Sequence, residues 1–247
     1  MSRHVPRFHV QQPLTAGGAV LLDSTVAHHL VRVLRARTGD PLILFDGSGG
    51  EWQAEITEII RHKSGDQVHA ELKAHIGAQR ESPLRITLAQ LLLRADRMDY
   101  CLQKATELGV AVIQPLWADN QKIPNESQLQ RKSQHWQAVI QSAAEQSGRT
   151  ALPLLESPQR LSTWQPVDAA SARLLLAPEG GLTLQQCLPA TSLTLLIGAE
   201  SGLDDVSLQQ ARSAGFQALR LGPRTLRAET AGPAAIAAIQ CLWGDLG

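Results

Sequence analysis

Residues 85–247 alternate continuous apolar runs with segments of helical periodicity. The run RITLAQLLL (85–93) is typical of a strand buried on both faces. The next segment, ADRMDYCLQKATELGV (95–110), repeats apolar residues every three or four positions, and VAVIQPL (110–116) is again a strand pattern. Strand, helix and strand in this order predict an α/β domain with a parallel sheet.

Two helices are predicted with defined faces and ends. The first helix begins at the N-cap Asp96 and ends at Gly109. Its buried face is predicted to consist of Met98, Cys101, Leu102, Ala105 and Leu108. A longer one covers SQLQRKSQHWQAVIQSAAEQSGR (127–149), ends near Gly148 and buries Trp136, Val139, Ile140, Ala143 and Ala144. Arg149 then suits the negative end of the helix dipole.

Three more apolar runs each stop in a glycine or proline turn: RLLLAPEGG (173–181), LTLLIGAESG (193–202) and LRLGPR (219–224). Parallel sheets bind ligands beyond the carboxyl ends of their strands, so these turns predict one pocket. Neither G-x-G-x-x-G nor GxxxxGK[ST] is present, which excludes the two common phosphate-binding fingerprints. A largely neutral ligand held by backbone groups, such as an adenosine moiety, fits this pattern.

The stretch LRLGPRTLRAETAG (219–232) concentrates charged and polar side chains between two Gly-Pro breaks. It reads as a strand, a loop and then a helix with Pro233 at the first helical position. The loop carries Arg224, Arg227, Glu229 and Thr230. It is a candidate for catalysis or ligand binding. Arg227 and Glu229 also fit a simple structural ion pair that braces the loop.

The first 75 residues predict a small β-barrel or sandwich. PLILFDGSGG (41–50) followed by the alternation of Trp52, Ala54 and Ile56 is a hairpin signal, and QVHAELKAHI (67–76) alternates in the same way. AQRESPLR (78–85) is the predicted linker. We therefore expect two domains, 1–75 and 82–247.

A short basic helix is predicted between the early strands of this first domain. Its apolar face would consist of Val26, Leu30, Val33 and Leu34. The polar face would present His29, Arg32, Arg35 and Arg37. Such a face can hold RNA phosphates, and it also fits an ordinary solvated surface.

Composition narrows the function classes. The 247 residues include 23 basic and 23 acidic side chains, so the formal net charge is zero and gives no sign of a nucleic-acid partner. Any basic surface must be local. Three widely spaced cysteines argue against a disulfide framework, and the adjacent His28 and His29 lack ligand spacing, so no metal is expected. The chain shows neither a leader nor a membrane-spanning run, and we expect a cytoplasmic protein.

Several motifs together resemble one known family. ADRMDYCLQKATELGV, AAEQSGR, LLIGAESGL and LRLGPRTLRAETAG, with PRFHV, HHLVRVLRARTGD and LFDGSGG before them, look like the RsmE family of the SPOUT superfamily, the 16S ribosomal RNA uridine N3 methyltransferases. The resemblance implies a PUA-like N-terminal barrel and a C-terminal α/β domain with a deep trefoil knot. It also implies S-adenosylmethionine as the cofactor, a homodimer, and 16S rRNA of the small ribosomal subunit as the partner.

The resemblance also assigns site residues. The cofactor loops become Leu176, Ala177, Pro178, Glu179 and Gly180; Ile197, Gly198, Ala199, Glu200 and Gly202; and Leu221, Gly222, Pro223, Thr225 and Leu226. The predicted catalytic residues are Arg227, Arg224, Glu229 and Glu200. Expected RNA contacts are Arg7, His29, Arg32, Arg35, Arg37, Arg94, Arg97 and Arg149.

The second cofactor loop departs from the family pattern IGPEGGLS. Ala199 replaces proline and Ser201 replaces glycine. If that position needs a positive φ, Ser201 carries roughly 1 kcal/mol of strain. A damaged loop would favour a non-catalytic RNA-binding or ribosome-assembly factor, and a SPOUT enzyme acting on another RNA is the other alternative.

Overall fold

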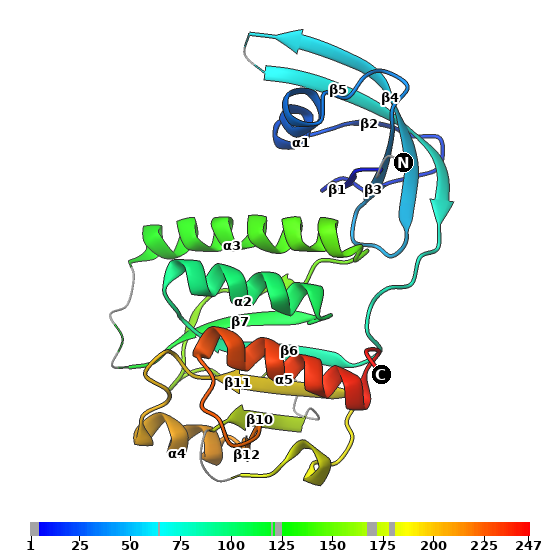
Figure 1. Ribbon diagram of the computed structural model, residues 1–247. Coiled ribbons are helices and arrows are strands. Elements are labelled where there is room, and N and C mark those ends of the chain that lie inside the picture. Colours follow the sequence, from blue (N-terminus) through cyan, green and yellow to red (C-terminus); the bar gives the residue numbers. More distant parts are fainter. Residues whose placement is uncertain (1–4, 64, 120, 122–124, 167–171, 178–180) are drawn as a thin grey trace. The chain divides into compact units, whose positions relative to one another are not determined.

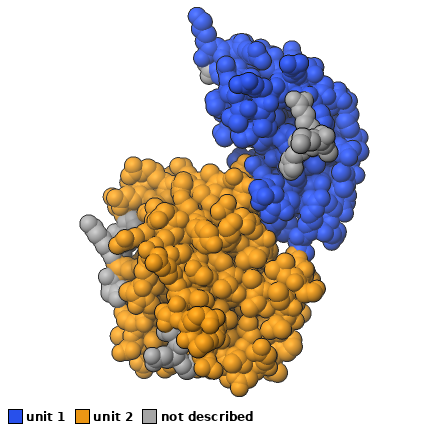
Figure 2. All heavy atoms as spheres, in the orientation of Figure 1, with its two compact units in different colours: residues 1–81, 144–151 blue, residues 82–143, 152–247 orange. Residues whose placement is uncertain are grey.

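The computed structural model describes residues 5–63, 65–119, 121, 125–166, 172–177 and 181–247. The chain forms two compact units (Figure 2). Unit 1 contains Met1–Glu81 and Ala144–Ala151, and unit 2 contains Ser82–Ala143 and Leu152–Gly247. The change from unit 1 to unit 2 at Glu81 and Ser82 lies within the segment predicted as a linker, whereas 144–151, predicted in the second domain, cluster with unit 1.

Unit 1 is built on a five-stranded sheet with the order β1-β3-β4-β5-β2 (Figure 1). The strands are β1 (Arg7–His9), β2 (Ala19–Leu21), β3 (Pro41–Phe45), β4 (Glu51–His62) and β5 (Gly65–Ile76). β1 pairs with β3 in parallel, and the other neighbours are antiparallel. The predicted alternation buries Ala54 and Ile56 on β4, while Trp52 is only partly buried.

The basic segment of unit 1 is not a regular α-helix. Helix α1 (Ser24–His28) is capped by the Asp23 side chain and continues as the π-helix η1 (His29–Val33). The wider turn, in which the Leu34 N–H donates to the His29 carbonyl, rotates the following side chains. Leu30 and Val31 are buried, whereas Val33 is 59% and Leu34 42% exposed. The prediction that Val33 and Leu34 face inward was therefore wrong.

Unit 2 is a parallel α/β fold, as the apolar runs predicted. Its strands are β6 (Arg85–Leu91), β7 (Val112–Trp117), β8 (Leu154–Leu155), β9 (Gln159–Arg160), β10 (Ala172–Leu176), β11 (Ser192–Ile197) and β12 (Gln217–Leu219). They follow the order β12-β10-β11-β6-β7-β8, with β9 also on β7, and every described pairing is parallel. The trefoil knot stays a prediction.

Helices cover this sheet. They are α2 (Ala95–Glu107), α3 (Glu126–Ser147, whose last residues belong to unit 1), α4 (Asp205–Ser213), α5 (Ala228–Trp243) and the 3-10 turn η2 (Leu184–Gln186). α5 packs on α2 and on strands β6 and β11 (Figure 1). None of the helices in the described residues is both long and apolar enough to cross a membrane.

The helix ends differ in part from the predictions. Gly109 and Gly148, at φ 82° and 83°, follow the ends of α2 and α3 as expected. The N-cap of α2 is Arg94, so the prediction of Asp96 was wrong and Asp96 lies in the first turn. The start of α5 at Pro233 was also wrong: α5 begins at Ala228, more than one turn earlier, because Arg227 takes the N-cap conformation.

Candidate functional site

The carboxyl ends of β10, β11 and β12 meet around a cavity of about 680 Å³ in unit 2. Because parallel strands end at one edge of the sheet, the three loops that follow them lie together. The predicted cofactor residues that line the cavity are Leu176, Ala177, Ile197, Gly198, Ala199, Glu200, Gly202, Leu221, Gly222, Thr225 and Leu226. Pro223 does not line it, and Pro178, Glu179 and Gly180 lie outside the described residues.

The loop after β11 folds back on itself without strain at Ser201. The Gly202 N–H donates to the Ala199 carbonyl at 2.9 Å, and Gly202 has a φ of 77°. A Cβ on Gly198 would lie 3.0 Å from the carbonyl carbon of Gly202, so the two glycines pack backbone to backbone. Among the described residues other than glycine only Arg35 has a positive φ. The strain expected at Ser201 is absent, because the left-handed position falls on Gly202.

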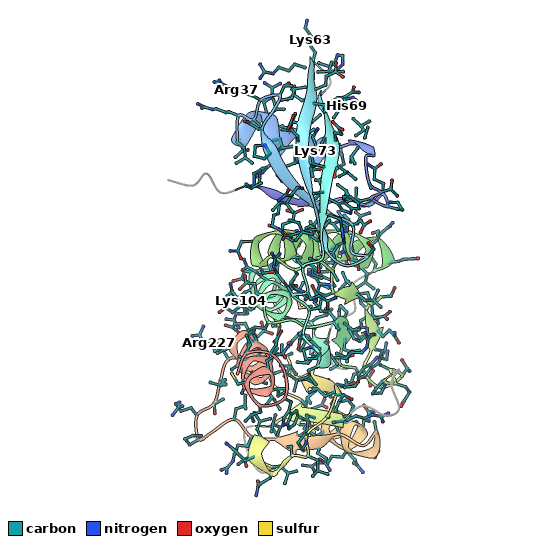
Figure 3. All side chains as sticks on the ribbon, turned by 90° about the vertical axis from the view of Figure 1, so that its right-hand side faces the viewer. Arg37, Lys63, His69, Lys73, Lys104 and Arg227 are labelled. Atoms are coloured by element: carbon teal, nitrogen blue, oxygen red, sulfur yellow. The ribbon has the colours of Figure 1, made fainter. Side chains whose placement is uncertain are left out.

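The loop after β12 brings two predicted catalytic arginines to the cavity. Arg224 and Arg227 both line it, and Gly222 takes a φ of 73° at the turn. Arg227 is the N-cap of α5, where its carbonyl accepts the N–H groups of Thr230 and Ala231. Its side chain is 78% exposed and extends from the N-terminal end of α5 (Figure 3). The guanidinium is therefore available to a ligand.

Charged groups from three elements form what we call the open cluster: Arg97, Glu200, Arg227 and Glu229. Arg97 of α2 lies between two carboxylates, with Nη1 3.4 Å from Glu200 Oε1 and Nε 3.7 Å from Glu229 Oε1. Arg227 Nη1 is 4.0 Å from the same oxygen of Glu229. Arg97 is thus placed beside the cavity that the loops form, although the sequence predicted it as an RNA contact.

One carboxylate oxygen of Glu229 has no hydrogen-bond partner among the described residues. Glu229 lies in the first turn of α5, and its side chain is 15% exposed. Its Oε2 is buried and accepts no hydrogen bond from the described residues. A buried acceptor without a donor is unfavourable unless a ligand supplies one, so this oxygen can take an N–H or a proton.

Beneath the cavity, the thiol of Cys101 is held in its protonated form. Burial, and secondly the negative charge of Glu229, raise the pKa of Cys101 to about 12. The protonated Sγ donates to Gln90 Oε1 at 3.4 Å. Gly232 of α5 closes over this pair, since a Cβ there would lie 3.6 Å from both the sulfur and the Gln90 oxygen.

Sequence reasoning missed several residues of this region. Leu208 and Arg212 of α4 and Arg220 after β12 also line the cavity. Their helical or loop spacing gave no signal. Gln90 did have a signal in the sequence, because it is the single amide side chain inside the apolar run RITLAQLLL.

The predicted RNA contacts of η1 and the residues after it are on the surface of unit 1. His29, Arg32, Arg35 and Arg37 are exposed. Arg32 is fixed by the buried Asp66, with Nε 2.8 Å from Oδ2. Arg35, two residues after the end of the π-helix, takes a φ of 54°, which is uncommon for a residue other than glycine. Figure 3 shows Arg37 and Lys63 pointing away from the ribbon of this unit.

Two other predicted RNA contacts are instead buried in unit 1, in what we call the closed cluster: Arg7, Glu51, Arg80, Glu81 and Arg149. The Arg7 side chain is 9% exposed, donates to Glu51 at 2.8 Å and lies over the Phe45 ring. Arg149 is 5% exposed and donates through Nε to Glu81 at 2.9 Å. The donors of Arg7 and Arg149 thus face protein carboxylates where strand β1 and the end of α3 pack together, and their contact with RNA stays a prediction.

The remaining RNA candidate, Arg94, is exposed at the start of α2, and its backbone N–H donates to Glu200 Oε1 at 3.2 Å. No group of three histidine, cysteine or acidic side chains placed to hold a metal occurs among the described residues. The three cysteines, Cys101, Cys187 and Cys241, are free thiols.

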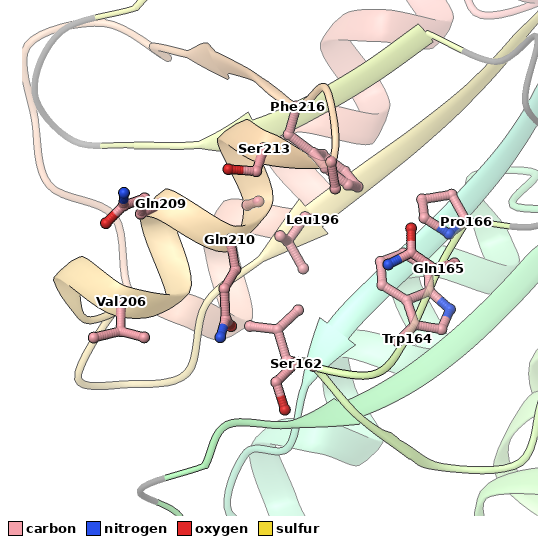
Figure 4. Close-up of a pocket in the computed structure, with 13 residues that line it drawn as sticks. Ser162, Trp164, Gln165, Pro166, Leu196, Val206, Gln209, Gln210, Ser213 and Phe216 are labelled. Atoms are coloured by element: carbon pink, nitrogen blue, oxygen red, sulfur yellow. The ribbon is translucent and has the colours of Figure 1, made fainter.

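A second cavity, of about 470 Å³, has a different lining. Figure 4 shows it between α4 and the segment around Trp164. Gln209, Gln210 and Ser213 face it, and Phe216 lies near Trp164 with ring centroids 6.2 Å apart. Its described lining holds no charged side chain. It therefore lacks the charged groups that line the first cavity.

Comparison with known proteins agrees with this arrangement. The family description "RNA methyltransferase domain" matches residues 80–240, and "RNA methyltransferase PUA domain" matches residues 22–64. A ribosomal RNA small subunit methyltransferase E of Buchnera aphidicola from Schizaphis graminum is 31% identical, with 100% of both chains covered. One from Synechocystis is 32% identical over 90% of this chain and 73% of its own.

Solved structures are similar over the whole chain. The methyltransferase E of Neisseria gonorrhoeae, crystallised with S-adenosylmethionine, is 35% identical, with a TM-score of 0.91 and coverage of 99% of this chain and 100% of that one. A Legionella pneumophila structure in complex with the same cofactor is 32% identical, with a TM-score of 0.93 and the same coverage. This chain belongs to the RsmE family of RNA methyltransferases.

Proposed function

We propose that this protein transfers a methyl group from S-adenosylmethionine to N3 of one uridine in 16S rRNA of the small ribosomal subunit. The observation that carries the proposal is the open cluster beside a cavity formed by three strand-end loops. The small-subunit methyltransferases E that resemble the whole chain support the substrate, and two cofactor-bound structures support the cofactor.

The residues of the cavity fit S-adenosylmethionine. A volume of about 680 Å³ lies within the usual range for small-molecule sites. Gly198 packs closely on Gly202, and both glycines bring backbone without a side chain to the lining of the cavity. Leu176, Leu221 and Leu226 would offer apolar surface and Glu200 a negative charge, which suit a cofactor that combines an adenosine with a sulfonium cation. When bound, the cofactor supplies an electrophilic methyl group on a sulfonium sulfur.

The chain's own residues must make uridine N3 nucleophilic, since this nitrogen carries a proton at neutral pH. We assign to Arg227, assisted by Arg224, hydrogen bonds to the uracil oxygens, which stabilise the negative charge that develops as the proton leaves. The 78% exposed Arg227 side chain can reach a base that enters from solvent. A single preorganised donor of this kind is worth about 2.7–4 kcal/mol in the transition state.

Glu229 is the proposed proton acceptor. Its Oε2, which has no partner among the described residues, can accept the N3 proton, while Oε1 faces Arg97 and Arg227. Arg97 also faces Glu200, so it links the loop after β11 to the start of α5. We therefore propose that Arg97 positions the two carboxylates instead of contacting RNA.

Unit 1 is the proposed RNA-binding unit. Its exposed basic residues, His29, Arg32, Arg35 and Arg37, can contact phosphates, and electrostatic contacts of this kind position an RNA without reading its sequence. We further propose that the protein acts as a cytoplasmic homodimer, as the family resemblance implies.

A transfer assay tests the function. Purified small ribosomal subunits that lack the modification are incubated with the protein and labelled S-adenosylmethionine, and the methylated nucleoside is mapped by mass spectrometry. The expected result is a single 3-methyluridine in 16S rRNA. Label in transfer RNA alone would point to another RNA substrate. Absence of any label, with subunits that a known methyltransferase modifies, would favour a non-catalytic binding factor.

A further inference from the structure

A buried glutamine joins the sheet to the loop after β11. Gln90 is fully buried near the carboxyl end of β6, in register with Ile197 of β11. Its Nε2 donates to the Leu91 carbonyl at 3.0 Å and to the Gly198 carbonyl at 3.3 Å. Its Oε1 accepts from the Cys101 thiol at 3.4 Å. The amide is thus bonded on both sides, by β6, by the loop after β11 and by α2.

The chemistry of these partners fixes the orientation of the amide. The carbonyl oxygens of Leu91 and Gly198 are acceptors only, so the NH₂ group of Gln90 must face them. The remaining oxygen then faces the thiol of Cys101, which stays protonated and can donate. A flipped amide would bring three oxygens together and leave these groups without partners, at a cost of about 1–3 kcal/mol for each buried group.

Gly198 lies where strand β11 ends and the loop that lines the cavity begins. The β6–β11 ladder ends at the pair Gln90 and Ile197, and Gly198 is the first residue of the loop. Because Gly198 packs against Gly202 and Ala199 bonds to Gly202, the position of Gly198 sets the position of the whole turn. Gly198, Ala199 and Gly202 all line the cavity.

We propose that Gln90 is a positioning residue for cofactor binding: it holds the Gly198 carbonyl so that the loop after β11 presents its backbone to S-adenosylmethionine. This inference rests on the proposed cofactor. It assigns a role to a side chain that does not itself line the cavity.

The neighbouring strand contains a matched control. Gln114 of β7 is 3% exposed and is bonded in the same manner. Its Nε2 donates to the Pro115 carbonyl and to the Ser157 carbonyl, both at 2.9 Å, and its Oε1 accepts from Gln159 Nε2 at 3.4 Å. None of these residues lines the cavity. Gln90 and Gln114 therefore share chemistry and burial but hold different loops.

The test compares Gln90→Met with Gln114→Met in the full-length chain. Chemical unfolding measures stability, and calorimetric titration with S-adenosylmethionine measures the Kd. Both variants should lose similar stability, because each leaves carbonyls without a donor. Only Gln90→Met should raise the Kd, by about tenfold or more, whereas Gln114→Met should stay within about twofold of the unmodified chain.

Further readouts separate positioning from general destabilisation. Cys101→Ala keeps Gln90 but removes the donor that orients it, and should raise the Kd by about threefold, which provides a second test if Gln90→Met does not fold. An unchanged Kd in Gln90→Met, or in Cys101→Ala should Gln90→Met not fold, would overturn the inference, and so would an equal rise in Gln114→Met. If the unmodified chain does not bind S-adenosylmethionine, the proposed cofactor itself fails.

Discussion

The closed cluster of unit 1 and the open cluster of unit 2 are made of the same residue types and do different things. In the closed cluster, Arg7 and Glu51 have side chains only 9% and 3% exposed. Arg7 also donates to the carbonyls of Ala144 and Glu145 near the end of α3 and to that of Arg149 just beyond it. In the open cluster, the Arg227 side chain is 78% exposed, and its Nη1 is 4.0 Å from Glu229 Oε1.

This difference indicates how to separate structural arginines from functional ones. The donors of Arg7 are used by a carboxylate and by carbonyls that a helix end leaves unsatisfied, so its substitution should affect folding. Arg227 lines a cavity with a side chain that is 78% exposed, and Glu229 beside it has an oxygen without a partner in the described residues. Substitutions in the open cluster should therefore affect turnover.

The largest expected effect is at Glu229. Glu229→Gln keeps the shape of the side chain but removes its ability to accept a proton. We expect the rate of methyl transfer to fall by about 10²–10⁴-fold with a nearly unchanged Kd for S-adenosylmethionine. Single-turnover assays with saturating cofactor measure the rate. Glu107→Gln, which alters a partly buried pair with Lys104 away from the cavity, is the control, and a Glu229→Gln rate equal to that of the control would refute the assignment.

The second effect concerns stability. Glu51→Ala leaves the nearly buried Arg7 without its carboxylate, and loss of one partner of a buried pair typically costs about 3–5 kcal/mol. The free energy of unfolding should drop by this order in urea titrations. Lys73→Ala, which breaks an exposed pair with Glu71, should cost less than about 1 kcal/mol. Equal losses in the two variants would contradict the structural role of the closed cluster.

Acid should weaken the closed cluster selectively. Burial tends to raise the pKa of Glu51, but hydrogen bonds from Arg80 and Arg7 outweigh it and hold the pKa below its ordinary value of 4.5. The stability that this lowered pKa provides is present above pH 4.5 and is lost as the pH falls through the lower, folded-state value. The stability of the unmodified chain and of Glu51→Gln, measured against pH, should converge in acid. Parallel curves would show that Glu51 does not contribute this dependence.

The smallest effect is expected on the RNA surface of unit 1. Replacing both Arg35 and Arg37 with alanine should weaken RNA binding and reduce its salt slope by about 1 for each phosphate that is no longer neutralised. Filter binding at several salt concentrations measures the slope. Arg85→Ala with Arg131→Ala removes the same charge from exposed positions of unit 2. An equal change in slope for the two double variants would show that Arg35 and Arg37 belong to an ordinary solvated face and do not contact RNA phosphates.

Much of the fold could be predicted because its signals are local. The apolar runs at 85–93 and 193–197 predicted buried parallel strands, and the turns that end three such runs predicted one cavity. Gly109 and Gly148 marked helix ends through a backbone conformation that other residues avoid.

The errors arose where tertiary contacts or irregular backbone decide. Periodicity assumes 3.6 residues per turn, so it placed Val33 and Leu34 on the wrong face of a segment that contains a π-turn. A single proline is an equally weak guide to a helix start: Pro233 suits a first turn, yet α5 starts at Ala228. The carboxylate partners of Arg7 and Arg149 could not be predicted either, because they lie 44 and 68 residues away along the chain, beyond any local pattern.

The most direct measurement is the single-turnover rate of Arg227→Ala beside that of Glu51→Gln, each with saturating S-adenosylmethionine and unmodified small subunits at a temperature where both are folded. We expect the rate of Arg227→Ala to be about 10²–10³-fold below that of the unmodified chain, with cofactor binding retained. Glu51→Gln should react within about twofold of the unmodified rate, since its loss affects folding. Near-normal transfer by Arg227→Ala, or an equal loss in both variants, would contradict the separation of a catalytic cluster from a structural one.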